Sequence, residues 1–210
     1  TTIDVTIDDG QATVTQANDI GALTTGVLSA TMDDTLSMSD YVDGDGLLLL
    51  DETTNALVVT LNDVADVNAA DIVTLDNATS GLITFVGAAN LQGTLADLTL
   101  VYASSNEDTP GVAGISSLTI TVTDEGEISA SELNAINDET DGLITIDTSV
   151  TSITGLAADH LLAAAADDGA QITGLTDAAV PITVTVTDDV SVADINTISS
   201  AHDGVVTATI

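Results

Sequence analysis

The chain has 210 residues, of which 44% are hydrophobic and 34 are acidic, and it contains no lysine, arginine or cysteine. This composition supplies material for a core but excludes disulfide bonds and ion pairs with basic side chains, and it argues against binding to nucleic acid, whose phosphates are contacted by basic side chains. A formal net charge of −34 favours surroundings rich in cations. Aromatic residues make up only 1%, so the core must be aliphatic.

The N-terminal residues TTIDVTIDDG contain neither a basic stretch nor a long apolar run, so we expect no signal peptide within this sequence, although one could have been removed already. The longest apolar run, Leu47 to Leu50, is far too short to span a bilayer. We therefore expect no membrane insertion.

The first predicted unit, residues 1–56, opens with TIDVTIDDGQATVTQANDIGALTTGVLSAT. It reads as a strand, a helical stretch, a glycine at Gly26 and a second strand. Later segments of the chain repeat this order more closely, so we interpret residues 1–56 as a diverged copy of a repeat.

Residues 41–52, YVDGDGLLLLDE, resemble the calcium loop D-x-[DN]-x-[DN]-G-x5-E. Asp43 and Asp45 take two ligand positions and Glu52 takes the last, while Asp40 stands beside the first position, which Tyr41 occupies. The pattern predicts a calcium site built from these four acidic residues. The alternative is an acidic turn between strands, and we expect no other cofactor.

The repeat is clearest in three aligned segments, which begin at Leu57 (LVVTLNDVADVNAADIVTLDNATSGLITFV), Leu118 (LTITVTDEGEISASELNAINDETDGLITID) and Ile182 (ITVTVTDDVSVADINTISSAHDGVVTATI). Their glycines are 61 (142−81) and 62 (204−142) residues apart. A constant period of this kind indicates a single repeat array. We divide it into a diverged repeat (1–56), two repeats (57–117 and 118–181) and a half repeat (182–210).

Within each copy the pattern predicts local structure. TITVT and ITVTVT alternate apolar residues with threonine, which is typical of a strand with one buried face. Ser129 and Ser191 then precede apolar residues at helical spacing, so each serine is expected to cap a helix of about two turns. Gly81, Gly142 and Gly204 are expected to end these helices in the left-handed conformation before a second strand begins.

Each copy contains a strand, a short helix, a glycine and a second strand. One such unit is too small to bury its own apolar face, so the copies must stack to form a core. We therefore predict a mainly β fold, a β-solenoid of parallel stacked strands with short helices or turns at its corners. The alternative is an α/β parallel-sheet domain, for which these helices look too short and the aromatic residues too few.

Acidic pairs follow the predicted strands and helices, at Asp8-Asp9, Asp33-Asp34, Asp124-Glu125, Asp167-Asp168 and Asp188-Asp189. Stacked corners would bring such carboxylates together, which predicts weak, repeated calcium binding, with a solvated acidic edge as the alternative. The two histidines are isolated in sequence. His160 aligns with Leu98 in an apolar helical stretch, so a packing role is expected for it rather than a ligand role.

The segments ITVTVTDDVSVADINTI, GVVTATI and ITGLAADHLLAAAADDGAQITGL resemble the tandem repeats of large acidic cell-surface and extracellular proteins of marine bacteria, cyanobacteria above all. The likeness covers most of the chain from about Leu57 onward. It implies an extracellular or cell-surface location and an architectural, adhesive or matrix role, and it carries no catalytic residues.

We find no catalytic constellation such as Ser-His-Asp, Cys-His or H-E-x-x-H, so we do not expect an enzyme. Strand units stand at both ends of the sequence, which favours head-to-tail stacking of copies into a cation-stabilised homopolymer or membership of a longer array. A surface adhesin that grips a cell-surface polysaccharide is the closest alternative. The T-x-T spacing leaves an ice-binding solenoid as a third.

Overall fold

A computed structural model describes residues 3–43, 46–47, 55–62, 66–106, 111–168, 171–175 and 181–210. Of these residues, 34% lie in seven helices and 35% in strands, and the strands form parallel sheets. The fold is therefore mixed α/β, as in the alternative, and the prediction of a mainly β solenoid is wrong. The helices cause the difference, because α4 (Leu95–Ser105), α5 (Ala130–Glu139) and α6 (Ala157–Asp168) have 11, 10 and 12 residues, about three turns each instead of two.

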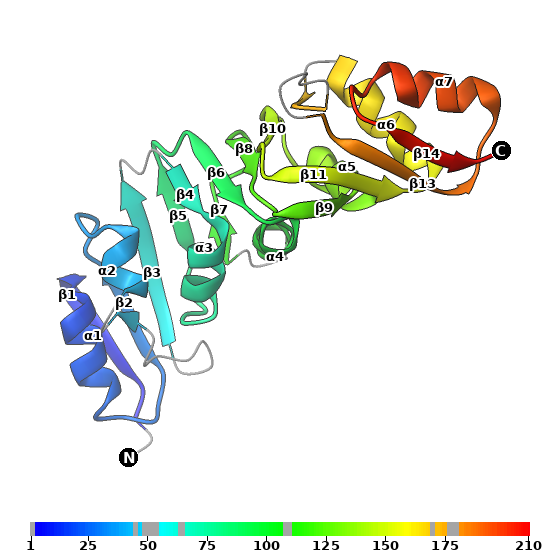
Figure 1. The fold of residues 1–210 in the computed structure, drawn as a ribbon. Helices are drawn as coiled ribbons and strands as arrows, with labels where there is room; N and C mark the ends of the chain where they lie inside the picture. Colours follow the sequence, from blue (N-terminus) through cyan, green and yellow to red (C-terminus); the bar gives the residue numbers. More distant parts are fainter. Residues whose placement is uncertain are drawn as a thin grey trace. The chain divides into compact units, whose positions relative to one another are not determined.

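The chain divides into two compact units, one formed by Thr1–Ala89 and Leu100–Ile115 and the other by Asn90–Thr99 and Ser116–Ile210, so that helix α4 (Leu95–Ser105) is shared between them. In the first unit, the sheet has the order β1-β2-β3-β5-β7, and the colours of its strands follow the chain in Figure 1. The elements of this unit are β1 (Val5–Ala12), α1 (Val14–Gly21), β2 (Leu28–Met32), α2 (Met38–Val42), β3 (Asn55–Asn62), β4 (Asp66–Asn68), α3 (Ala69–Asp76), β5 (Ile83–Val86) and β7 (Val112–Ala113).

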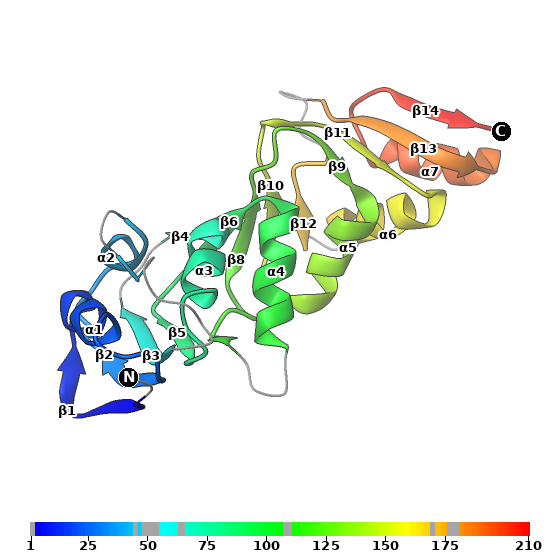
Figure 2. The same cartoon turned by 90° about the horizontal axis from the view of Figure 1, so that it is seen from below.

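The second unit contains two parallel sheets, in which the strands follow the orders β6-β8-β10-β12 and β9-β11-β13-β14. Helices α5, α6 and α7 lie side by side along the latter sheet (Figure 2). The elements are β6 (Asn90–Gly93), α4 (Leu95–Ser105), β8 (Thr119–Val122), β9 (Gly126–Ser129), α5 (Ala130–Glu139), β10 (Ile144–Ile146), β11 (Val150–Gly155), α6 (Ala157–Asp168), β12 (Ile172–Thr173), β13 (Thr183–Asp189), α7 (Val192–Ser200) and β14 (Val206–Thr209).

In each sheet the strand order follows the order of the chain. Ile120 of β8 pairs with Ile144 of β10, which pairs in turn with Ile172 of β12, always in parallel. A parallel neighbour requires a crossover, and helices α5 and α6 lie in these two crossovers. Each crossover also contains one strand of the other sheet, β9 in the first and β11 in the second, so the two sheets of this unit are built up alternately.

The alternating strand pattern predicted the buried face correctly. In β3, Leu57, Val59 and Leu61 are fully buried, whereas Val58 is 38% exposed. The predicted serine caps are also confirmed, because the side chains of Ser129 and Ser191 accept hydrogen bonds from backbone N–H groups in the first turns of α5 and α7. The core is built mainly from aliphatic side chains, as the composition predicted, and Tyr41, Phe85 and Tyr102 are buried with them.

The repeat glycines act differently from what the sequence predicted. None of Gly81, Gly142 and Gly204 has a positive φ, so the predicted left-handed conformation is wrong. A Cβ at Gly142 would overlap the carbonyl oxygen of Leu118, at the start of the preceding strand. The same overlap occurs in the other copies, between Gly26 and Ile3, Gly81 and Leu57, and Gly204 and Ile182. Glycine is therefore required for close backbone approach.

Candidate functional site: acidic strand ends and a histidine pair

The predicted calcium loop lies partly in the described residues. Asp40 lies in α2, and its Oδ2 accepts hydrogen bonds of 2.7 Å from both the N–H and the Oγ of Ser37. These two hydrogen bonds lower the pKa of Asp40. The Asp40 carboxylate therefore helps to cap the short helix α2, and this role occupies one of its two oxygens.

The neighbouring loop positions depart from a calcium loop. Tyr41, at the first ligand position, is buried, and its hydroxyl donates to the carbonyl oxygen of Asp33 at 3.3 Å. Asp43 is exposed just after α2. Partial burial, and secondarily the charge of Asp43, raise the pKa of Asp71 in the first turn of α3.

Asp45 and Glu52 lie outside the described residues, so of the predicted ligands the structure describes only Asp40 and Asp43. Among the residues that are described, no group of three or more histidine or acidic side chains could hold a metal ion. Calcium binding by this loop stays a prediction.

Two acidic strand ends contact helices instead. Asp124 follows β8, and its Oδ2 accepts the backbone N–H of Leu95, the first residue of α4, at 2.8 Å. Asp188 lies at the end of β13, and its Oδ1 accepts the N–H of Ala157, the first residue of α6, at 2.8 Å. Each carboxylate satisfies a free donor at a helix N-terminus and interacts favourably with the helix dipole. Each carboxylate thereby links its strand end to the start of the helix in the preceding strand–helix segment.

We expect Asp188→Ala to lower the free energy of unfolding by about 1 kcal/mol, since it removes a charged cap from α6 at a largely exposed position. Asp189→Ala is the matched control, because Asp189 is the exposed neighbour, and it should change stability by less than about 0.5 kcal/mol. Urea unfolding followed by circular dichroism measures both. Equal effects of the two variants would show that Asp188 has no special capping role.

The two histidines are far apart in sequence but meet in the second unit. His160 of α6 and His202, after α7, are 0% and 4% exposed, and their ring centroids lie 6.3 Å apart with the planes at 83°. His160 Nε2 donates to the carbonyl oxygen of Thr185 at 3.2 Å, and His202 Nδ1 to that of Ile198 at 2.9 Å. The expected burial of His160 is thus observed, but the pairing was not predicted.

Burial is the main effect on His160 and lowers its pKa; the hydrogen bond to Thr185 opposes this, and the smaller charge effects of His202, which lowers the pKa, and of Asp159 and Asp188, which raise it, follow. One repeat earlier, the same two positions hold Leu98 (160−62) and Thr140 (202−62). The pair is therefore a local replacement of a leucine and a threonine that the repeat otherwise uses.

Threonines form rows across the outer faces of the sheets. In register, Thr121 of β8 pairs with Thr145 of β10, which pairs with Thr173 of β12. Thr185 lies between Thr154 and Thr207 in the same way. These rows take one threonine from each successive strand, which is denser than the single T-x-T motif per repeat seen in the sequence.

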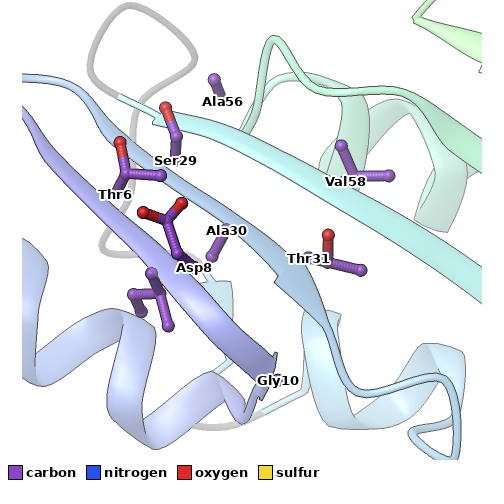
Figure 3. A pocket seen from close by; sticks show the side chains of 9 residues that line it. Thr6, Asp8, Gly10, Ser29, Ala30, Thr31, Ala56 and Val58 are labelled. Atoms are coloured by element: carbon purple, nitrogen blue, oxygen red, sulfur yellow. The ribbon is translucent and has the colours of Figure 1, made fainter.

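The outer face of β1, β2 and β3 carries a shallow hollow of about 320 Å³ (Figure 3). Its lining includes the hydroxyls of Thr6, Ser29 and Thr31 and the carboxylate of Asp8, together with Val58. Small polar side chains on an open sheet face could contact a hydroxyl-rich ligand only weakly, because the hollow is shallow.

Comparison with protein-family models, with curated proteins and with solved structures found no match. None of the helices in the described part of the chain is long and apolar enough to cross a membrane.

Sequence reasoning missed the cap acceptors and the histidine pair for different reasons. Asp124 and Asp188 carried a signal, since both follow the same T-V-T strand ending. Their partners lie 29 and 31 residues earlier, however, and only the stacking of strands identifies them. For the histidines the signal was the repeat period: His160 lies 62 residues after Leu98, and His202 lies 62 residues after Thr140.

Proposed function

We propose that this chain is a secreted structural module that self-associates head to tail into an extracellular filament or surface layer. The observation that supports this most is the strictly sequential, parallel pairing of strands, in which each added strand leaves a new edge of the same kind. Sequential parallel addition is how solenoid arrays extend, and the same rule can operate between molecules.

The acidic composition fits this role. With 34 acidic residues and no basic ones, side-by-side contact between copies is opposed by charge repulsion. Growth along the strand-stacking direction uses backbone hydrogen bonds, which need no charged partner. Divalent cations such as calcium would reduce the remaining repulsion, which makes the assembly cation-stabilised in this proposal.

Sedimentation velocity tests the proposal with calcium at millimolar concentration and again after chelation. We expect species larger than a monomer whose share rises with protein concentration and falls on chelation, because screening of the −34 charge is lost. Magnesium and matched sodium chloride are the controls for specific calcium binding and for simple screening.

A monomer at every concentration would contradict self-association. That result would favour the alternative, in which the chain is a repeat segment of a large cell-surface adhesin. Polysaccharide binding would then be tested first at the hollow lined by Thr6, Asp8 and Ser29. The threonine rows keep the ice-binding alternative as a third candidate.

A further inference from the structure

Three neighbouring strands of the first unit carry no charge. Strands β2, β3 and β5 read LSATM, NALVVTLN and ITFV, without one acidic residue, in a chain where 34 of 210 residues are acidic. These strands lie side by side in the sheet. Repulsion between copies, which follows from the net charge of −34, is therefore reduced over their outer face.

Aliphatic side chains are exposed on this outer face. Val58 of β3 and Leu82, just before β5, are each 38% exposed, and Val86 at the end of β5 is 50% exposed. Because the next residues, Val59 and Ile83, pair with each other, Leu82 lies beside Val58 on neighbouring strands. Leu82 and Val86 therefore form an apolar stripe along β5, with Val58 next to it.

The fold does not require aliphatic residues at these positions. In the following repeat, the places of Val58 and Val86 are taken by Thr119 (58+61) and Asp147 (86+61). Strands β8 and β10 nevertheless pair in the same register as β3 and β5. Exposed aliphatic side chains that folding does not demand indicate a contact surface.

The hollow of about 320 Å³ lies on the same face, on the other side of β3 from the apolar stripe (Figure 3). Small side chains such as Thr31 and Ala56 line it, and Val58 stands at its edge towards β5. Asp8 of β1 is the one acidic residue in its lining. The face thus presents larger apolar side chains and a recess next to each other.

The chemistry of this face favours a second copy as its partner. Tyr41, Phe85 and Tyr102, the three aromatic residues, are buried, so none of them can stack on a sugar. A basic partner would find its charges elsewhere, on the acidic remainder of the chain. Valine, alanine, serine and threonine on two facing sheets can interdigitate, as the inner faces of packed sheets do.

We propose that the outer face of β2, β3 and β5 is a contact between two copies of the chain, related by a two-fold axis that runs along β3. Val58 then meets its counterpart, and Leu82 and Val86 of each copy enter the hollow of the other. A two-fold contact uses one self-complementary surface twice, which the apolar stripe and the hollow provide. This contact joins copies side by side and does not rest on the head-to-tail contact of the proposed function.

Replacing the two aliphatic residues by those of the following repeat tests the contact. Val58→Thr combined with Val86→Asp should fold, as circular dichroism checks, because equivalent strands already carry these residues. In sedimentation velocity with a chelator and about 0.5 M sodium chloride to screen repulsion, we expect the wild type to dimerise and the double variant to do so at least about tenfold more weakly. Val192→Asp adds the same charge at a residue 59% exposed in α7 and should dimerise like the wild type.

Cross-linking gives a second measurement. The chain has no cysteine, so a single introduced thiol reports on its own position. A short bis-maleimide should join two copies of Val58→Cys, whereas the control Val192→Cys should stay monomeric. Absence of the Val58→Cys product would contradict an axis along β3.

The remaining outcomes separate this contact from the proposed function. A monomeric wild type in high salt would overturn the contact and leave the face to another partner. If calcium-dependent assemblies form equally with the double variant, the side-by-side contact is refuted while the proposed function stands. If association stops at a dimer that the double variant loses, the contact is supported and the proposed function fails.

Discussion

Gly142→Ala is expected to destabilise the second unit by more than about 3 kcal/mol, a large part of the stability of a small domain. The methyl group would overlap the carbonyl oxygen of Leu118, and both groups belong to backbone that is held by neighbouring strands. The Oγ1 of Thr140 accepts the N–H of Gly142 at 2.9 Å and fixes this approach further. The backbone cannot move away without breaking the pairing of β8 with β10.

Two controls separate this mechanism from the one predicted by sequence. Gly126 has a φ of 93° and open space around it, so Gly126→Ala should cost only about 1–2 kcal/mol of backbone strain. Asp141→Ala, at the exposed neighbour, should change stability by less than about 0.5 kcal/mol. Urea unfolding gives all three values. Similar losses for Gly142→Ala and Gly126→Ala would contradict close approach as the reason for the repeat glycine.

Acidification is expected to destabilise the second unit through buried His160. Burial places the pKa of His160 below its ordinary value of 6.5, so below about pH 6.5 the unfolded chain binds more protons than the folded one. The contribution of neutral His160 to stability is therefore present above about pH 6.5 and is lost as the pH falls. The free energy of unfolding should fall by up to about 1.4 kcal/mol for each pH unit.

The chain supplies the matched variant. His160→Leu combined with His202→Thr installs the residues of the preceding repeat, which occupy the same positions without a titrating group. Between about pH 7 and pH 5, the free energy of unfolding of this variant should fall less steeply than that of the wild type, because the histidine contribution is gone. The carboxylates are the same in both proteins and contribute equally to the two profiles. Thermal unfolding across that range measures the difference. A wild type and variant with parallel pH profiles would show that the pair does not sense acid.

Much of the local structure could be predicted from the sequence. Alternation in TITVT and ITVTVT indicated strands with one buried face, and Ser129 and Ser191 were recognised as caps. Both signals are local, because they depend on side-chain periodicity and on a hydrogen bond within one turn. The fold class was predicted wrongly because helix length depends on packing, and α6 continues through alanines that carry only a weak apolar pattern.

The contacts that define the candidate site could not be predicted in this way. The glycine requirement at Gly142 comes from a carbonyl 24 residues earlier, at Leu118 (142−118), and sequence alone favoured the commoner left-handed role. The caps from Asp124 and Asp188 likewise depend on which helix lies beside each strand end. Of the predicted calcium ligands, Asp40 has a capping role that local spacing with Ser37 could have indicated.

Electron microscopy of the purified chain in calcium shows whether copies of it assemble head to tail. We expect filaments or layers with a regular axial repeat, built along the direction in which strands stack. Dispersed single particles for the wild type at every protein and calcium concentration would contradict it.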